Sequence, residues 1–197
     1  MSIPEKITLY HEMNMLDRVI NNVASKETSL SQSDINKVIV AAQIQEGIER
    51  YRSAANSMST QSLRAEEHNS ARLARHLEEK LGSRPSRCHP HAIVAGRHSL
   101  SAQLRIILAK LKIRIDDPDN GCWLPENTAA TPHPKFPSAP PHSRIHRYNY
   151  YYWINGRLSP LRQEGLMRTN LQLVARMLQT GDFPEFVMLK KGRGIPA

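Results

Sequence analysis

The sequence has few cysteines, no long apolar run and no recognisable secretory signal. Its two cysteines, Cys88 and Cys122, are too few for a disulfide framework or a four-cysteine zinc site, so we expect two buried free thiols. No apolar stretch approaches the length that crosses a bilayer, so we expect no membrane partner. The opening residues lack a basic segment followed by an apolar one. We therefore expect a chain made in the cytoplasm, which would leave the cell only through a dedicated secretion system.

Negative charge is scarce in the C-terminal part of the chain. Residues 1–80 carry 10 Lys and Arg against 11 Asp and Glu, whereas residues 81–197 carry 17 against 7. The net charge of +9 therefore resides in the C-terminal part. Such a surplus favours polyanion binding, because neutralising phosphates releases condensed counterions. The alternative is a basic surface that only maintains solubility.

The spacing of apolar residues divides the chain into an N-terminal helical region, residues 1–82, and a C-terminal region, residues 83–197. The first region predicts a helix over 4–24, a second helix that begins at a capping box, and a third that ends at Gly82. The capping box pairs Ser31 with Asp34. We expect this region to serve as a delivery or adaptor segment.

The histidines of the N-terminal region carry no recognisable chemistry. His11, His68 and His76 stand at positions of expected helices, and we expect them on helix surfaces.

The C-terminal region mixes short strands with helices, which predicts an α+β fold. The expected elements are a strand over 91–95, a basic amphipathic helix over 99–113, a turn over 116–121, an extended piece over 122–125, a proline-rich loop over 126–141, a helix over 143–158, one or two helices ending at Gly181, and a flexible basic tail.

Four histidines in this region have spacings typical of convergent ligands. His89 and His91 are two apart on an expected strand, so their side chains point to the same side. His142 and His146 are four apart on an expected helix, so their rings can converge on one cation. The plainer alternative for the second pair is a solvated helix face.

Five aromatic residues fall within 148–153. Tyr148, Tyr151 and Tyr152 fit the buried side of a helix together with Ile145 and Ile154. The remaining aromatics could contact sugars or stack on bases.

Three ordered segments carry a family resemblance. "PHAIVAGRH", "IRIDDPDNGCWLP" and "PHSRIHRYNYYYWIN" together resemble the AHH family of the HNH/endonuclease VII nuclease superfamily, over about residues 86–158. The resemblance implies a ββα-metal core built from a strand histidine pair, a turn asparagine and a helical histidine pair. It also implies the toxin end of a bacterial polymorphic or interbacterial effector, restrained by a cognate immunity protein.

The sequence departs from the family at one position. Pro90, His91 and Ala92 stand where the family has Ala-His-His, so one of the two strand histidines is missing unless His89 has taken its role.

The resemblance assigns site roles to this chain. His91 becomes the general base, and His142 and His146 the ligands of one divalent ion such as Mg, Mn, Zn or Ni. Asn120 belongs to the catalytic set, either completing the metal sphere or tying the turn to the strand. His89 could assist.

The residues around this set have predicted supporting roles. Arg144 and Arg147 flank the ligands and could hold the scissile phosphate. Gly121 is expected to permit a tight turn, and Asp117 and Asp119 to cap it rather than to bind metal.

The sequence thus predicts a metal-dependent endonuclease acting on nucleic acid, with DNA as the expected substrate. One alternative is a non-catalytic nucleic-acid-binding protein with a degenerate ββα-metal site, for which Ala92 is the sign. Another is a helical adaptor whose histidines bind structural zinc.

Overall fold

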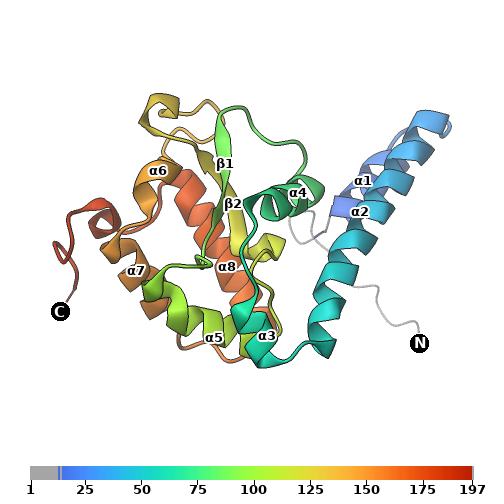
Figure 1. Ribbon diagram of the computed structural model, residues 1–197. Coiled ribbons are helices and arrows are strands. Elements are labelled where there is room, and N and C mark those ends of the chain that lie inside the picture. The colour runs from blue at the N-terminus through green and yellow to red at the C-terminus, as the bar shows by residue number, and fades with distance from the viewer. Residues whose placement is uncertain (1–12, 14, 197) are drawn as a thin grey trace, which may run out of the picture.

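A two-stranded antiparallel sheet with helices on both faces forms the centre of the computed structural model (Figure 1). The structure describes residue 13 and residues 15–196. The helices are α1 (Met15–Ala24), α2 (Gln32–Ser57), α3 (Thr60–Ala65), α4 (Ser70–Leu81), α5 (Ala102–Lys110), α6 (His142–Ile145), α7 (Tyr148–Leu158) and α8 (Glu164–Thr180). The strands are β1 (Cys88–Ala92) and β2 (Gly121–Pro125). Short 3-10 turns are η1 (Ser99–Ser101), η2 (Pro118–Asn120), η3 (Thr128–Ala130) and η4 (Glu185–Met188). The expected mixture of helices and a small sheet is confirmed.

The N-terminal region is helical, as predicted, but its elements differ in detail. The capping box at the start of α2 is confirmed, with Asp34 N donating to Ser31 Oγ at 3.2 Å and Ser31 N to Asp34 Oδ2 at 3.3 Å. The predicted helix over 4–24 is seen only as α1, and its earlier part lies outside the described residues. The predicted helix end at Gly82 is confirmed, but the prediction of one continuous helix is wrong, because side-chain caps at Ser59 and Asn69 start two separate helices, α3 and α4.

The sheet presents different side chains to its two faces because successive residues alternate. His91 pairs with Cys122, and His89 with Leu124. Cys122 and Leu124 pack in the main core with α5, α7 and α8. On the opposite face, Leu73 and Leu77 of α4 pack against Cys88, Ala92 and Trp123. Both cysteines are buried free thiols, as expected.

The strand predicted over 91–95 is displaced toward the N-terminus. β1 ends at Ala92, which pairs with Gly121, the residue that follows the turn formed by η2. Ile93 and Val94 are buried as expected, but their N–H groups donate to Asn120 instead of extending the ladder. The turn therefore ends the strand.

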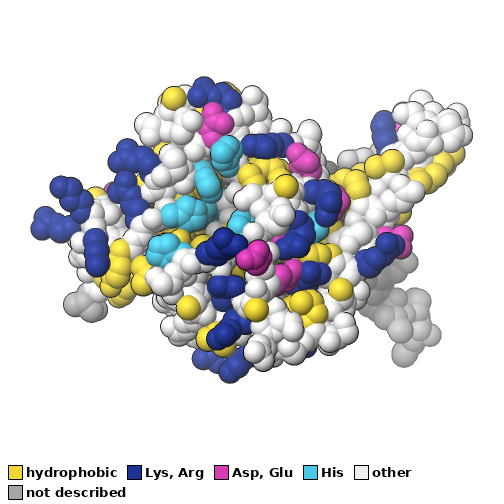
Figure 2. All heavy atoms as spheres, in the orientation of Figure 1, with side chains coloured by type: hydrophobic (Ala, Val, Ile, Leu, Met, Phe, Trp, Pro, Cys, Tyr) yellow, Lys and Arg dark blue, Asp and Glu magenta, His cyan; other side chains and the backbone are white. Residues whose placement is uncertain are grey.

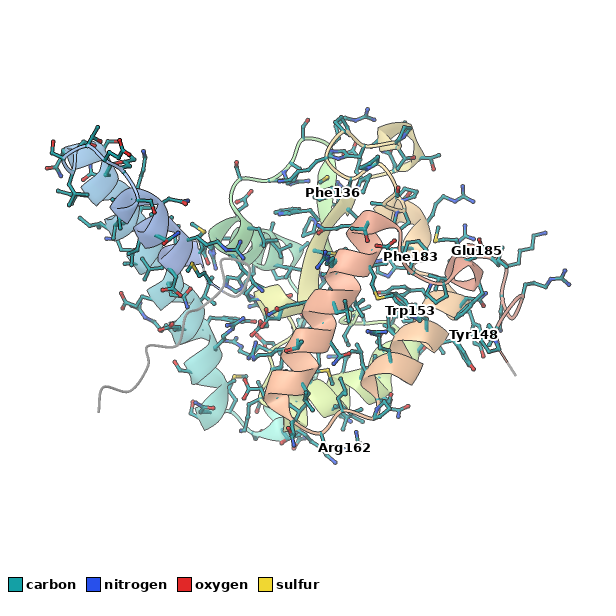
Figure 3. The ribbon with its side chains drawn as sticks, turned by 180° about the vertical axis from the view of Figure 1, so that it is seen from behind. Phe136, Tyr148, Trp153, Arg162, Phe183 and Glu185 are labelled. Carbon is teal, nitrogen blue, oxygen red and sulfur yellow. The ribbon has the colours of Figure 1, made fainter. Side chains whose placement is uncertain are left out.

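The helix predicted over 143–158 is broken at His146, whose backbone angles are φ −71° and ψ 71°. Because of this break, α7 buries a different side from the one predicted for a continuous helix. Tyr151 is buried as predicted, but Tyr148 and Tyr152 are exposed, at 39% and 44%. Tyr150 and Trp153 are buried in their place, and Trp153 lies near Phe183 at the end of α8 (Figure 3).

The helix predicted over 99–113 is shorter than expected. Leu104 and Leu108 of α5 are buried as predicted, while Leu100 lies in η1 and is 38% exposed. α8 ends at Gly181, as predicted, with φ 82° in the left-handed region. None of the described helices has the length and apolarity needed to span a bilayer.

The basic tail was predicted to be flexible, but the buried side chain of Asn149 holds it against α7. Its Nδ2 donates to the carbonyls of Phe186, Lys190 and Arg193 at 2.7, 3.2 and 3.1 Å. Its Oδ1 accepts from Gly192 N at 2.9 Å. One amide in the segment predicted as an aromatic helix therefore orders residues 186–193.

Replacing Asn149 with alanine is expected to lower the free energy of unfolding by about 1–3 kcal/mol, because several hydrogen bonds of one buried side chain are lost. Trypsin should then cut at Lys190 and Lys191 faster than in the unaltered protein, as followed by mass spectrometry. Asn170→Ala is the control, since Asn170 bonds only its own helix, to Leu166 O. Equal cutting in both variants would show that Asn149 does not hold the tail.

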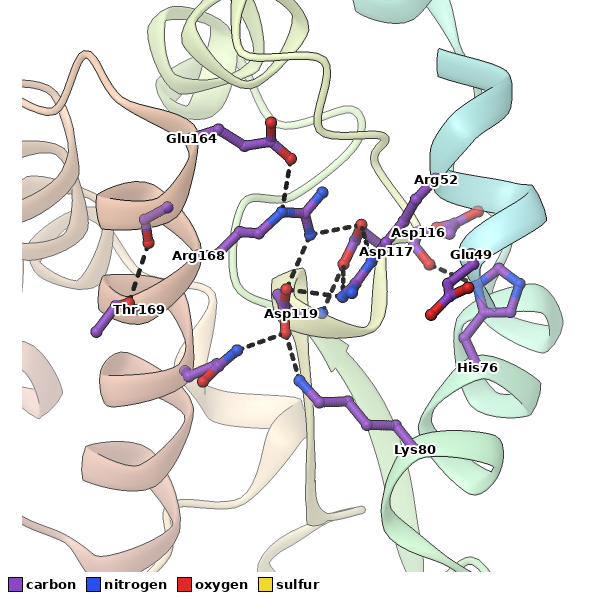
Figure 4. Close-up of polar contacts among 12 residues, drawn as sticks. Glu49, Arg52, His76, Lys80, Asp116, Asp117, Asp119, Glu164, Arg168 and Thr169 are labelled. Atoms are coloured by element: carbon purple, nitrogen blue, oxygen red, sulfur yellow. Dashed lines mark hydrogen bonds and ion pairs between the residues drawn. The ribbon is translucent and has the colours of Figure 1, made fainter. Parts of the chain in front are cut away.

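A buried ionic cluster joins the N-terminal helices to the turn before β2 (Figure 4). Asp119 accepts from Arg52 of α2, Lys80 of α4, and Arg168 and Gln172 of α8. Asp117 caps the turn at Asp119 N, as predicted. It also pairs with Arg52 and Arg168.

The neighbouring residue Asp116 is hydrogen-bonded to two histidines that were expected on helix surfaces. His68 Nδ1 lies 2.5 Å from Asp116 Oδ1, and His76 Nδ1 lies 2.7 Å from the Asp116 carbonyl. The surface expectation is wrong for His76, which is buried, and His68 lies in the connection between α3 and α4. His11 lies outside the described residues. The division at residue 82 stays a prediction, and the contacts of Arg52 and His68 with this turn argue for a boundary before α2.

Candidate active site and metal centre

Three histidines converge where β1 meets α6. One nitrogen from each of His91, His142 and His146 lies within 4.8 Å of the others. His91 comes from β1, His142 is the first residue of α6, and His146 is the residue at which α6 ends. The ring of His91 lies 5.5 Å from that of His142 and 5.0 Å from that of His146. The structure therefore groups the predicted base with the two predicted ligands.

Hydrogen bonding fixes the proton of the buried His91 ring. The Tyr150 hydroxyl donates to the Ile93 carbonyl at 2.8 Å. Its oxygen must then accept from His91 Nε2, 2.9 Å away, so the His91 proton is on Nε2. His91 Nδ1 is left with its lone pair, and it is buried without a hydrogen-bond partner. An orphaned, buried nitrogen that faces two other imidazoles is the arrangement expected of a metal ligand.

The other two histidines, His142 and His146, are also kept in the neutral form, which can offer a lone pair to a metal ion. His146 Nδ1 lies 2.9 Å from the Tyr151 hydroxyl, which can accept its proton and leave Nε2 for a metal. Burial, followed by the nearby His146 and His89, lowers the pKa of His142 to about 4. Burial also lowers the pKa of His146, and it lowers the pKa of His91 well below its usual value. The cluster is therefore uncharged at neutral pH, the form that binds a cation.

Asn120 has no free group for a metal or substrate. It is buried, and its Nδ2 donates to the carbonyls of Ile115 and Val94 at 2.8 and 3.2 Å. Its Oδ1 accepts from Val94 N at 2.9 Å. Of its two expected roles, this geometry favours tying the turn to the strand over completing the metal sphere.

Gly121 has a different role from the predicted one. Its backbone is extended, at φ −142° and ψ 157°, which any residue adopts. A Cβ at this position would lie 2.8 Å from Leu73 Cδ1. Glycine is therefore needed so that α4 can approach β2, not to make the turn.

The remaining predicted site residues lie at the rim. His89 is about half exposed, 3.8 Å from Glu126, and its ring is 5.6 Å from that of His142. Arg147 donates to the carbonyls of Met188 and Arg144 at 2.6 and 2.8 Å. The side chain of Arg144 is exposed. Of the two arginines, Arg144 has its guanidinium more available to a phosphate.

A cleft of about 450 Å³ opens onto the histidine cluster. Besides His142 and His146, it is lined by Ala92 and by two histidines that had no predicted role in the site, His68 and His98. Figure 2 shows histidine side chains gathered on this face, with Lys and Arg side chains around them. The roles of the tyrosine hydroxyls were also missed, because an aromatic run in a sequence indicates burial and says nothing of hydrogen-bond partners.

Comparison with known proteins agrees with this geometry. The model of AHH, described as a nuclease family of the HNH/ENDO VII superfamily with conserved AHH, matches residues 72–179. The match covers more than half of the chain and includes both strands and all three clustered histidines. The chain therefore belongs to the AHH nuclease family. No curated protein and no solved structure matches it.

Proposed function

We propose that this chain is a metal-dependent endonuclease that hydrolyses DNA phosphodiester bonds with one divalent ion held by His91, His142 and His146. The observation that carries the proposal is the convergence of three neutral imidazole nitrogens, one of them orphaned and buried. The orphaned Nδ1 of His91 supports the role of third ligand for this residue in place of the expected role of base.

The donor set bears on the identity of the ion. Among the described residues the cluster consists of three imidazoles without a carboxylate, a donor set that suits Zn or Ni better than Mg or Mn, which prefer oxygen ligands. When bound, such an ion would supply positive charge to a phosphate oxygen and to the leaving oxygen.

The protein's own residues position the substrate and the ligands. Tyr150 and Tyr151 hold the rings of His91 and His146. Asn120 holds the ends of the two strands together, and so fixes His91 relative to the turn. Exposed Arg144, two residues from His142, can bind the scissile phosphate.

DNA is the substrate we favour. The support for a nucleic-acid substrate in general is stronger than the support for DNA over RNA. It consists of family membership and the surplus of 17 basic over 7 acidic residues after position 80. We further propose an antibacterial effector role with a cognate immunity protein, with residues before α2 as the delivery segment. The support here is the family resemblance alone.

The test is cleavage of supercoiled plasmid DNA by the metal-stripped protein after addition of Zn, Ni, Mn or Mg. We expect nicking with at least one transition metal, and we expect excess chelator to abolish it. A parallel assay on single-stranded RNA separates the two substrate classes. If no metal supports cleavage while plasmid binding persists, the chain is a binding protein with a degenerate site, as Ala92 would imply. Cleavage that continues in excess chelator would contradict the metal.

A further inference from the structure

The proposed metal site leaves the cleft without an obvious general base. Once His91, His142 and His146 hold a cation, none of their lone pairs can take a proton from water. Ala92, at the position of the family's second strand histidine, has no titratable group. Hydrolysis at neutral pH still needs an acceptor for the proton of the attacking water. The following inference rests on the proposed nuclease function.

Three further histidines lie near the cluster, and the surroundings of two of them argue against a role as base. His98 Nδ1 accepts from Leu100 N at 3.2 Å, so the neutral ring carries its proton on Nε2 and has no free lone pair. The ring of His98 also stacks on Tyr151, with centroids 4.0 Å apart. His89 lies beside Glu126 and does not line the cleft.

His68 has the opposite proton arrangement. Its Nδ1 lies 2.5 Å from Asp116 Oδ1, and a carboxylate can only accept, so Nδ1 carries the proton. Burial opposes ionisation of Asp116, but hydrogen bonds from His68 and Asn69 N outweigh it and lower the pKa of this carboxyl. Nε2 of His68 therefore keeps its lone pair. The Ser70 hydroxyl can donate to it at 3.2 Å, and because this hydroxyl can rotate, the lone pair can instead take a proton from a water in the cleft that both residues line.

The fold brings His68 to the side of the strand where the histidine is missing. Ala92 packs on the α4 face of the sheet, and His68 immediately precedes α4. Gly96 permits the approach, because a Cβ there would lie 2.4 Å from His68 Cβ. His68 lines the same cleft as His142 and His146, which places it beside the cluster.

We propose that His68, oriented by Asp116, is the general base of this nuclease in place of the histidine missing at position 92. The oxygen of a water molecule forms a bond to phosphorus as the bond from phosphorus to the leaving oxygen breaks. The water proton passes to His68 Nε2, and the leaving oxygen takes a proton from solvent. The Nδ1 proton stays on His68, and Asp116, which accepts it in a hydrogen bond, stabilises the imidazolium that forms.

The first test is single-turnover plasmid cleavage by His68→Ala at saturating metal. The rate should fall about 10²-fold or more, the scale of a general base. Added imidazole should restore part of it, since a free base can enter the space left by the ring. Zinc or nickel affinity, measured by calorimetry, should stay within about twofold, because His68 is not a proposed ligand. His98→Ala lines the same cleft and is the matched control; its rate should change less than tenfold.

A second measurement does not depend on activity. Side-chain ¹⁵N spectra of the unaltered protein should show His68 protonated at Nδ1 and unprotonated at Nε2 at the pH of the assay. A proton on Nε2 overturns the proposal, as does a His68→Ala variant that keeps its rate, resists imidazole rescue or loses metal affinity in step with activity. If the unaltered protein itself cleaves nothing with any metal, the proposed nuclease function is refuted, and the proposed role of His68 as its base is refuted too. If it cleaves and His142→Ala is inactive while His68→Ala is active, only the base is refuted.

Discussion

His91→Ala is expected to lose both metal binding and cleavage. Zinc or nickel affinity should fall at least about 100-fold, because residues that merely orient a ligand already contribute 10–100-fold. The cleavage rate should fall about 10³-fold, since the charge that the ion supplies is worth several kcal/mol in the transition state. Calorimetry and single-turnover plasmid cleavage measure the two quantities on one preparation. The joint loss follows from the orphaned Nδ1 of His91 and its distance from His142 and His146.

The paired measurement separates the ligand role from the role of base that the sequence suggests. A base would lose rate and keep metal affinity, which is the outcome that would refute the three-histidine site. His89→Ala is the control, because His89 is on the same strand and face but is about half exposed beside Glu126. It should change neither quantity more than a few-fold. Circular dichroism of both variants should match the unaltered protein.

Asp119→Ala is expected to cause the largest loss of stability, about 3 kcal/mol or more. Removing one member of a buried ion pair leaves its partners uncompensated. Arg52 and Arg168 lie 2.8 Å from Asp119 Oδ2, and Lys80 and Gln172 bind Oδ1 (Figure 4). Urea unfolding at pH 7 measures the effect. Glu164→Gln is the control, since Glu164 also pairs with Arg168 but is 52% exposed and should contribute less than about 1 kcal/mol.

The loss from Asp119→Ala should depend on pH. Burial raises the pKa of Asp119, but Lys80 and Arg52 outweigh it and hold the pKa well below its usual range. A carboxyl whose pKa is lower in the folded state stabilises the fold above its unfolded pKa of about 3.9, and this contribution is lost as the pH falls further. The difference between Asp119→Ala and the unaltered protein should therefore be constant from pH 6 to 8 and shrink below pH 4. A difference that stays the same at pH 3 would contradict the ionic origin.

The parts of the fold that depend on local chemistry could be predicted from the sequence. The Ser31 capping box, the glycine that ends α8 and the extended segment before Pro125 were predicted correctly, because neighbouring residues determine each of them. The break at His146 could not be predicted. The segment has helical spacing throughout, and the break is accompanied by long-range bonds from Arg147 to Met188 and from Asn149 to Phe186.

The candidate site shows the same limit. The spacing of His142 and His146 was enough to suggest convergence, and the structure brings their rings to 5.2 Å even though they do not share one continuous helix. The proton position on His91 depends on Tyr150, 59 residues away in the chain. One partner of Asp116 is His68, 48 residues away. No local pattern records such pairs, so the sequence indicated the convergence of the histidines and missed the groups that orient them.

The ionic cluster around Asp117 and Asp119 limits how such a chain can be reshuffled during evolution. The carboxylates belong to the turn before β2, but two of their cationic partners, Arg52 and Lys80, are upstream of residue 82. A recombination joint at residue 82 would join this turn to an unrelated N-terminal segment that lacks Arg52 and Lys80. The carboxylates of Asp117 and Asp119 would then be buried side by side without these two cations. A joint ahead of α2 would carry the cations and the carboxylates together into the new gene.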